Sequence, residues 1–394
     1  MVDKMVGTVA AGKVYAFLGA TIASTFFIGV TFGLGYPLAA LTFEAWGQPS
    51  WILGIAGAAP SVGIVLALLV LPRLIAKLGA VQAIVSGSLL SAAGYLALFA
   101  LTGPWSWIAL RFSMGAFVTI AWLIVQVWTT TAAPAHISGR VLAAYSLAFA
   151  GGTAISPVLV EVMGFQGPLP FVAGAVLAVL AILPVLLVAR SAPHVEFKPI
   201  TGIASMVRTV PLTIVTSFFS GFMELSTVSL ITSVAIAGGL DVVPALRLVT
   251  AFLAGCTLMQ IPVGWLADRV RPLGIGVALC LINAAAVLSL PWVLPHFTAA
   301  AVIAFLMGGA AYGFYTLSMA LIGDHGAPAD HNTGNVAVIM GSQTGGVIGP
   351  LVCGAAMTGA TIAGFVGVIA FASLATAFAL VAIKRTQPKA RALT

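Results

Sequence analysis

Long apolar runs, separated by charged residues, Pro and Gly pairs or short polar breaks, fill almost the whole sequence. A helix needs about 20 mainly apolar residues to cross a bilayer, so each run of that length predicts one membrane span. The pattern therefore predicts an all-α polytopic membrane protein. Its twelve spans are expected at residues 14–41, 51–72, 79–102, 105–128, 139–163, 168–190, 209–237, 244–267, 273–294, 298–322, 333–357 and 360–383.

The composition supports this interpretation. Only 6% of the 394 residues are charged and 61% are hydrophobic, whereas ordinary soluble domains carry about 25% charged residues. A soluble protein of this length would need more charge to cover its surface, and a disordered chain would have a low hydropathy instead of the mean hydropathy of +1.16. Both classes are therefore excluded.

The net charge of +7 could indicate nucleic-acid binding, but the positions of the basic residues give another explanation. Fourteen of the sixteen Lys and Arg residues fall on one side of the twelve predicted spans. Because cytoplasmic loops are enriched in Lys and Arg, both termini are predicted to be cytoplasmic, in a multi-pass protein of a bacterial inner membrane. No nucleic-acid partner is expected.

The longest predicted connection, residues 191–208, divides the spans six and six. The sequence thus predicts an N-terminal six-helix bundle at 1–190, a cytoplasmic linker at 191–208 and a C-terminal six-helix bundle at 209–394. The halves also match in places at an offset of 193 residues, which favours two parallel six-helix repeats. The matches place Met114-Gly115 on Met307-Gly308, Gly152 on Gly345, and Pro157 on Pro350.

Ionisable residues within the spans are few, and each is a candidate site residue because a charge inside the membrane is costly. Glu224 lies near the middle of its span and Arg111 in the outer part of another, whereas Glu161 lies close to a span end, where it can reach the interface. At about 100° per residue, each of the first two shares a face of about 80° with polar residues. These stripes are Thr213, Ser217, Ser220, Glu224 and Thr227, and Arg111, Gly115, Thr119, Trp122 and Gln126.

Both stripes predict side chains that face a central cavity. Ser and Thr can instead bond to their own helix, and Arg111 could form a structural ion pair or extend to the interface. Weaker candidates for the same cavity are a few polar residues in other spans, which could equally pack between helices or anchor at the interface. They are Tyr36, Tyr145, Tyr312, Tyr315 and Gln343.

A short loop between two predicted spans carries a family signature. The chain there reads Pro-Val-Gly264-Trp-Leu-Ala-Asp268-Arg269, which resembles the Gly-xxx-Asp-Arg loop of the major facilitator superfamily. Arg111-xxx-Gly115 is similar to the Arg-containing span of that family, and Gly345 to Pro350 to its glycine-proline gating segment. The resemblance extends along the whole chain and implies two six-helix halves around a midplane site.

More narrowly, several residues resemble the YcaD-type branch of this superfamily. They are Trp105, Trp107, Arg111, Ser138, Arg140 and Tyr145, together with the loop from Gly264 to Arg269. Two positions depart from the family pattern. Ala76 stands where the equivalent earlier loop has Asp, and Gln126 stands where the branch has an acid.

The signature loop also predicts a gate. Asp268 at a helix end can accept hydrogen bonds from a neighbouring helix N-terminus and pair with a basic group, which would latch one conformation; Gly264 and Arg269 complete the loop. The alternative is a solvated pair that only sets topology. Close glycines allow tight helix approach and a proline loosens the backbone, so the other gating candidates are Pro157, Gly345, Gly349 and Pro350.

These features predict a secondary active transporter that moves a small molecule by alternating access and is coupled to protons, with Glu224 as carrier. The sequence contains no ATP-binding loop, and no predicted span carries a histidine that could bind a haem or act as a catalytic base. We therefore expect no enzyme activity, no cofactor and no bound metal. The expected partners are the small-molecule substrate, protons and the lipid bilayer, and the protein is expected to be a monomer.

Two alternatives stay open. Cys256 and Met259, joined by Met340 and Cys353, supply soft ligands that would suit a copper-importing protein of the same fold. Ala76 and Gln126, which replace the expected acids, would suit a membrane sensor or assembly factor that no longer transports.

Overall fold

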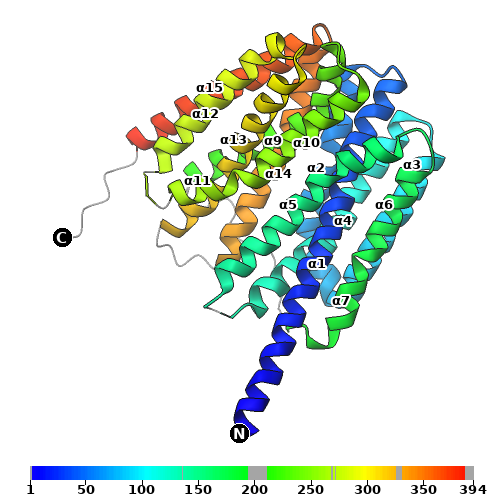
Figure 1. Cartoon of the computed structure of the whole chain (residues 1–394), viewed down its shortest axis with the longest axis vertical. Coiled ribbons are helices and arrows are strands. Elements are labelled where there is room, and N and C mark those ends of the chain that lie inside the picture. The colour runs from blue at the N-terminus through cyan, green and yellow to red at the C-terminus, as the bar shows by residue number, and fades with distance from the viewer. Residues whose placement is uncertain are drawn as a thin grey trace. The chain divides into compact units, whose positions relative to one another are not determined.

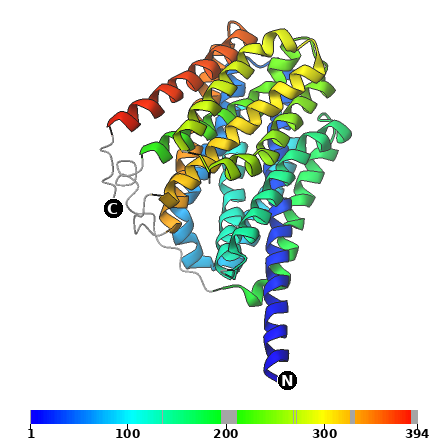
Figure 2. The same ribbon diagram turned by 60° about the vertical axis from the view of Figure 1, so that its left-hand side comes forward.

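The computed structural model describes residues 2–134, 136–193, 211–267, 269–270, 272–324 and 331–386. Within these ranges it describes all side chains except those of residues 2–11, 322–324, 331–333, 335 and 384–386. Every regular element among the described residues is a helix, as the coiled ribbons of Figures 1 and 2 show.

The chain forms two compact units, and the boundary between them falls inside one helix. Unit 1 comprises Met1–Trp46 and Ala59–Pro199, and unit 2 comprises Gly47–Ala58 and Ile200–Thr394. The helix that contains the boundary is α2 (Ser50–Leu78). The other elements of unit 1 are α1 (Val2–Ala45), α3 (Ala80–Ala100), α4 (Pro104–Ala132), α5 (Ser138–Met163), α6 (Leu169–Leu180), α7 (Ile182–Val188) and the short 3-10 helix η1 (Ala189–Ser191).

The helices of unit 2 that the structure describes follow one another between residues 211 and 386. They are α9 (Pro211–Ala237), α10 (Val242–Leu258), α11 (Gln260–Ala267), α12 (Pro272–Val293), α13 (Phe297–Asp324), α14 (His331–Met357) and α15 (Thr361–Thr386).

Twelve helical segments of the described chain are long and apolar enough to cross a membrane. Each overlaps one predicted span, and the ends differ by a few residues; the second span, predicted at 51–72, extends over Ser50–Leu78. The predicted all-α fold with twelve spans is confirmed.

Two of these spans are broken where the sequence places a proline inside an apolar run. The sixth, Leu169–Ser191, turns at Ala181 between α6 and α7, and the eighth, Val242–Ala267, turns at Met259 between α10 and α11. Pro184 and Pro262 follow these breaks by three residues. Because proline has no N–H to donate to the carbonyl four residues earlier, the helix is interrupted just before it.

Helix pairing is similar within the two units. In unit 1, α1 packs against α4, α5 and α6, and α3 packs against α4 and α6. In unit 2, α9 packs against α13, α14 and α15, and α12 packs against α13 and α15. The two most extensive pairs are α1 with α5 and α9 with α14. Matching pairs in the same chain order are the expected property of parallel repeats.

The domain boundaries, the linker and the orientation stay predictions. Residues 194–208 of the predicted linker 191–208 lie outside the described residues, as do several of the basic residues that define the cytoplasmic side.

Candidate functional site

Arg111 of α4 is a buried cation within unit 1, with a side chain only 4% exposed. Its Nη1 atom donates a hydrogen bond to the carbonyl oxygen of Gly35 on α1, and its Cζ atom lies 4.9 Å from the centroid of the Tyr36 ring. The negative face of the ring attracts the guanidinium, an interaction of about 2 kcal/mol where water is excluded. Arg111 therefore links α4 to two successive residues of α1.

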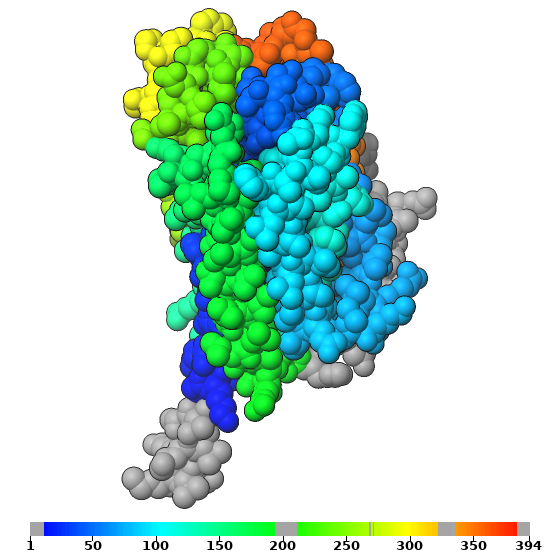
Figure 3. All heavy atoms as spheres, turned by 90° about the vertical axis from the view of Figure 1, so that its right-hand side faces the viewer, coloured from blue at the N-terminus to red at the C-terminus, as the bar shows by residue number. Residues whose placement is uncertain are grey.

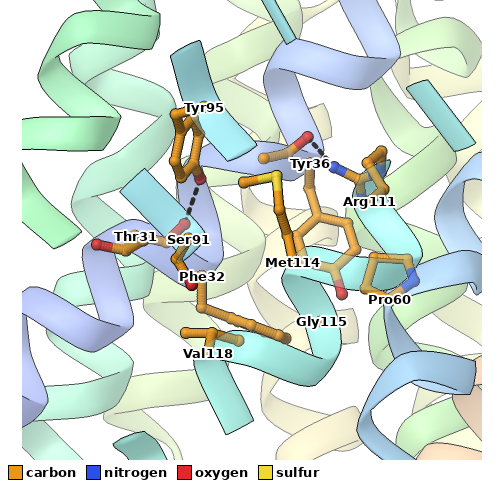
Figure 4. Close-up of a pocket in the computed structure, with 11 residues that line it drawn as sticks. Thr31, Phe32, Tyr36, Pro60, Ser91, Tyr95, Arg111, Met114, Gly115 and Val118 are labelled. Atoms are coloured by element: carbon orange, nitrogen blue, oxygen red, sulfur yellow. Dashed lines mark hydrogen bonds between the residues drawn. The ribbon is translucent and has the colours of Figure 1, made fainter. Parts of the chain in front are cut away.

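A cavity of about 30 Å³ lies beside this contact. Figure 4 shows the residues that line it. At the far side of it the Tyr95 hydroxyl of α3 donates a hydrogen bond to the carbonyl oxygen of Thr31 on α1. The volume suits about two water molecules or a small ion, and is too small for an organic substrate. Its lining residues are Thr31, Phe32, Gly35, Tyr36, Pro60, Ser91, Tyr95, Arg111, Met114, Gly115 and Val118.

Two glycines allow the helices around this cavity to approach closely. A Cβ atom at Gly35 would lie 2.9 Å from Nη1 of Arg111, and one at Gly115 would lie 2.6 Å from the Cα atom of Pro60 on α2. Both distances are shorter than a side-chain carbon can tolerate. The Arg-xxx-Gly motif thus places the cation one turn from a close crossing of α4 with α2.

The next residues of the predicted stripe on α4, Thr119 and Trp122, contact their own helix and α5. Thr119 donates a hydrogen bond of 2.7 Å to the Gly115 carbonyl of its own helix. The Trp122 ring stacks on Phe149 of α5, at a centroid distance of 5.5 Å, and the Tyr145 hydroxyl donates a hydrogen bond of 3.2 Å to the Trp122 carbonyl. Trp122 and Tyr145 are therefore brought together, as neighbours on α4 and α5.

Gln126 completes this stripe. Its side chain is buried, and its Oε1 atom has no hydrogen-bond partner among the described residues. A buried acceptor without a partner costs about 1–3 kcal/mol. A bound ligand or a water molecule that donates a hydrogen bond to this oxygen would remove the cost.

Glu224 is the acidic candidate, and it lies on α9 of unit 2. The residue is partly exposed, between the buried Met223 and Leu225. Its carboxylate is close enough to the thiol of Cys256 on α10 and to the hydroxyl of Tyr315 on α13 to interact with both electrostatically. No basic side chain among the described residues forms an ion pair with it.

Some of the hydroxyl residues that share the face of Glu224 donate hydrogen bonds to backbone carbonyls. Ser220 donates a hydrogen bond of 2.8 Å to the Ala311 carbonyl of α13, and Ser217 donates one of 3.1 Å to the Ile214 carbonyl of its own helix. The hydroxyls of Thr213 and Thr227 are buried and have no hydrogen-bond partner among the described residues. Thus, among the described residues, only some hydroxyls of the polar stripe on α9 have a hydrogen-bond partner within the protein.

The aromatic candidates of unit 2 lie together on α13. The rings of Tyr312 and Tyr315 are 5.3 Å apart between centroids, with planes inclined at 41°. Gln343 lies on α14, and its Oε1 atom, like that of Gln126, is buried with no hydrogen-bond partner among the described residues.

The glycines of α14 provide the close contact with α9. A Cβ atom at Gly345 would overlap the carbonyl oxygen of Phe218, and one at Gly349 would lie 2.6 Å from that of Phe222. Pro350 follows inside the same helix, and Pro157 lies inside α5. These four gating candidates therefore occupy the long helices that pack most extensively in each unit.

In the signature loop, the structure describes Gly264 and Arg269, but Asp268 lies outside the described residues. Gly264 belongs to α11, and the Cζ atom of Arg269 lies 3.7 Å from the centroid of the Trp265 ring. The basic member of the loop is thus held against an aromatic ring on the same segment.

Three neighbours of these residues were not expected from the sequence. Tyr95 and Met114 line the Arg111 cavity, and Cys256 lies near Glu224. A tyrosine in an apolar span gives some signal, since a buried hydroxyl needs a partner. Methionine and cysteine are ordinary in apolar helices and give none. No group of three or more His, Cys, Asp or Glu residues suited to a metal occurs among the described residues.

The sequence matches the family model described as Major Facilitator Superfamily over residues 16–294 and 243–394. The chain belongs to this superfamily. Among curated relatives, the uncharacterized MFS-type transporter YcaD of Escherichia fergusonii is 26% identical over 309 residues, which cover 77% of this chain and 78% of the relative. An uncharacterized MFS-type transporter of Enterobacter sp. strain 638 is 31% identical over 140 residues, or 35% of this chain and 36% of the relative.

Solved structures of family members share the fold. The nucleoside transporter NupG superposes with a TM-score of 0.75 at 14% identity, covering 95% of this chain and 100% of its own. A bacterial homologue of the human lysosomal transporter Spinster, in an inward-facing and occupied conformation, superposes with a TM-score of 0.72 at 14% identity, covering 93% and 94%. The chain is therefore a multi-pass membrane protein with the fold of a transporter, and its resemblance to the YcaD-type branch is confirmed.

Proposed function

We propose that the protein is a secondary active transporter that moves a small molecule by alternating access, coupled to protons. It acts in this proposal as a monomer in a bacterial inner membrane, with both termini in the cytoplasm. The observation that carries the coupling is Glu224, a partly exposed acidic residue near the middle of α9 with no basic partner among the described residues. Carboxylates within a membrane are rare and mark ion or proton pathways.

A proton carrier must bind its proton on one side of the membrane and release it on the other. The Glu224 carboxyl group can do both, and the hydroxyls of Thr213, Thr227 and Tyr315 supply polar groups around its path. Arg111 supplies the opposite charge within unit 1, where it would set affinity or coupling. Gln126, Trp122, Thr119, Tyr36, Tyr145, Ser217, Ser220, Tyr312 and Gln343 complete the proposed set of substrate and proton residues.

The proposal is tested by flux into proteoliposomes under an imposed pH gradient, screened over a panel of metabolites and drugs. Glu224→Gln keeps the shape of the side chain but cannot exchange a proton. It should therefore abolish accumulation driven by the pH gradient, while exchange of substrate without a gradient persists. Glu161→Gln, near the end of α5, is the matched control and should accumulate substrate normally. Normal accumulation by the Glu224→Gln protein would exclude this residue as the carrier.

Gating is proposed to involve the signature loop and the helices that contain glycine and proline at close contacts. The residues are Gly264, Asp268, Arg269, Pro157, Gly345, Gly349 and Pro350. If Asp268 latches one conformation, Asp268→Asn should change the accessibility of engineered cysteines at the two membrane faces and slow transport. Asp241→Asn, at the N-terminus of α10, is the matched control. Unchanged accessibility and flux would reduce the loop to a topology signal.

A further inference from the structure

Helix α2 is shared between the two units, and the boundary falls next to a proline. Its first part, up to Ala58, belongs to unit 2, and the rest belongs to unit 1. Pro60 is the second residue beyond the boundary. Because proline has no N–H, the helix lacks one backbone hydrogen bond at the point where it passes from one unit to the other. Residues 50–58 therefore form a short helical segment that is held by a different unit from the rest of α2.

The contact of this segment with the rest of unit 2 depends on glycines. A Cβ atom at Gly54 would overlap the Pro350 carbonyl oxygen of α14, and one at Gly354 would lie 2.8 Å from the Cα atom of Gly54. A Cβ atom at Gly57 would lie 2.6 Å from Oγ of Ser229 on α9. The backbone of the segment thus lies directly against α9 and α14, and Figure 3 shows the beginning of α2 (blue) beside the end of α14 (orange).

The longer part of α2, residues 59–78, is held as tightly within unit 1. A Cβ atom at Gly63 would overlap the Phe112 carbonyl oxygen of α4, and one at Gly115 of α4 would lie 2.6 Å from the Cα atom of Pro60. Alternating access requires the two units to move relative to one another. A straight α2 cannot keep both contacts during that movement, and the shorter contact is the one that yields.

The composition of the shorter contact suits repeated opening. Its tightest points are formed by glycine backbone and a serine, so the helices can part there without moving a large side chain out of a pocket. The Ser229 hydroxyl is buried with no hydrogen-bond partner among the described residues. An unsatisfied hydroxyl destabilises the closed contact, and water would satisfy it once the contact opens. The closed and open arrangements are therefore closer in free energy than a fully satisfied contact would allow.

We propose that residues 50–58 of α2 form a gate, which closes on α9 and α14 in one state of the transport cycle and separates from them in the other. The residues of the gate are Gly54, Gly57, Ser229 and Gly354. Gly54 and Gly57 permit the closed contact, since any side chain there would hold the helices apart. The inference rests on the proposed alternating access, but its test needs no substrate and no pH gradient. Failure of the gate and failure of proton coupling are therefore distinguishable.

The test measures how fast an engineered cysteine in the contact reacts with a charged methanethiosulfonate reagent. The full chain is placed in nanodiscs, where both membrane faces meet the solution. Ser229→Cys should react, because this position is only 5% exposed in the closed contact but reaches water when the gate opens. Ser156→Cys is the matched control, since Ser156 lies in the glycine contact of α5 with α1 inside unit 1. It should not react above the background of the three buried native cysteines.

A bulky residue in the gate should favour the open state. Gly54→Leu should raise the labelling rate of Ser229→Cys at least about tenfold, because the added side chain destabilises the closed contact only. Gly151→Leu, at a glycine with no atom within 4 Å of its Cβ position, is the matched control and should leave the rate unchanged. If thermal unfolding shows that the Gly54→Leu protein does not fold, Gly54→Ala replaces it, since even one methyl group meets the Pro350 carbonyl.

The closed state is tested with a disulfide. A Cβ atom at Gly57 would lie 2.7 Å from the Cβ atom of Ser229, and a disulfide joins Cβ atoms about 3.8 Å apart. A slight separation of the helices therefore lets Gly57→Cys and Ser229→Cys form a disulfide on oxidation with copper phenanthroline, seen as a loss of free thiols. Gly367→Cys with Ser229→Cys is the control pair, because no atom lies within 4 Å of the Cβ position at Gly367.

Three results would overturn the proposal. Equal labelling of Ser229→Cys and Ser156→Cys, in the parent and in the Gly54→Leu protein, would show that the contact does not open. Absence of the disulfide between positions 57 and 229 would show that the closed contact does not form. Equal labelling of Ser229→Cys in the Gly54→Leu and Gly151→Leu proteins would show that the glycine contact does not control the opening.

Discussion

Gly33 of α1 lies so close to Ser156 of α5 that a Cβ atom at Gly33 would be 2.5 Å from the serine Oγ. Unit 2 contains the same contact with the residue types exchanged, because a Cβ atom at Gly349 of α14 would overlap the Oγ of Ser226 on α9. The close crossing therefore belongs to the repeated fold, and either helix can provide the glycine that permits it.

Other glycines repeat between the units at the same offset. A Cβ atom at Gly152 would overlap the Phe26 carbonyl oxygen, and one at Gly345 would overlap that of Phe218. Gly115 against Pro60 and Gly308 against Phe252 form a second matched set. Both crossings thus have a glycine at the same place in each unit, and the paired positions are 192 or 193 residues apart in the sequence. The residue that the glycine meets is Phe in both units at the first crossing, but Pro60 in one unit and Phe252 in the other at the second.

The adjacent residues Gly151 and Gly152 allow a direct test of this close packing. Gly152→Ala should lower the free energy of unfolding by about 1–3 kcal/mol, because α1 must move away from α5. Gly151→Ala meets no atom within 4 Å and should stabilise the helix by up to about 1 kcal/mol. Thermal unfolding of the two purified proteins compares them. Equal shifts for the two variants would contradict the contact.

The contact between Arg111 and the Tyr36 ring predicts an energetic coupling. Tyr36→Leu should destabilise the protein, because the guanidinium loses the face of the ring, whereas Tyr36→Phe keeps the ring and should change stability less. In a double-mutant cycle with Arg111→Met, the coupling energy should be about 1–2 kcal/mol. If Tyr36→Leu costs the same with and without Arg111, the ring and the cation do not interact.

Orientation can be measured with reporters. Since fourteen of sixteen basic residues mark one side of the spans, a reporter fused after Lys198 or Thr394 should be cytoplasmic and one after His296 should be external. A cytoplasmic signal at His296 would contradict the proposed orientation.

The twelve spans could be predicted closely because the length of an apolar run alone decides whether it crosses a bilayer. The breaks at Ala181 and Met259 were not predicted, since a proline in a membrane span is often tolerated and its effect depends on the neighbouring helices. In the structure, Ser24 of α1 donates a hydrogen bond of 2.7 Å to the Ala181 carbonyl at one break.

The candidate site was predictable only within single helices. Periodicity grouped Arg111 with Gly115 on one face, and the cavity beside them contains both. Periodicity cannot show which residue of another helix faces that stripe, so Tyr95 of α3 and Gly35 of α1 were missed as neighbours of Arg111. Ser220 illustrates the same limit, because its partner is a backbone carbonyl on α13.

Gln126 offers a test that separates a functional residue from a structural one. Its Oε1 atom is buried without a hydrogen-bond partner among the described residues, so Gln126→Leu removes an unsatisfied acceptor and should stabilise the protein by about 1–3 kcal/mol. If the amide serves a ligand, the same variant should reduce transport in proteoliposomes. Higher thermal stability together with lower flux would therefore indicate a binding role, since loss of a structural residue lowers both.

Gln343→Leu on α14 is the matched variant in unit 2, because its Oε1 atom is also buried without a partner among the described residues. Thr129→Val on α4 is the control, since that hydroxyl donates a hydrogen bond of 2.7 Å to the Val125 carbonyl and serves its own helix. It should leave flux unchanged. A Gln126→Leu protein that is less stable than the parent, or one that is more stable and transports normally, would show that the amide does not serve a ligand.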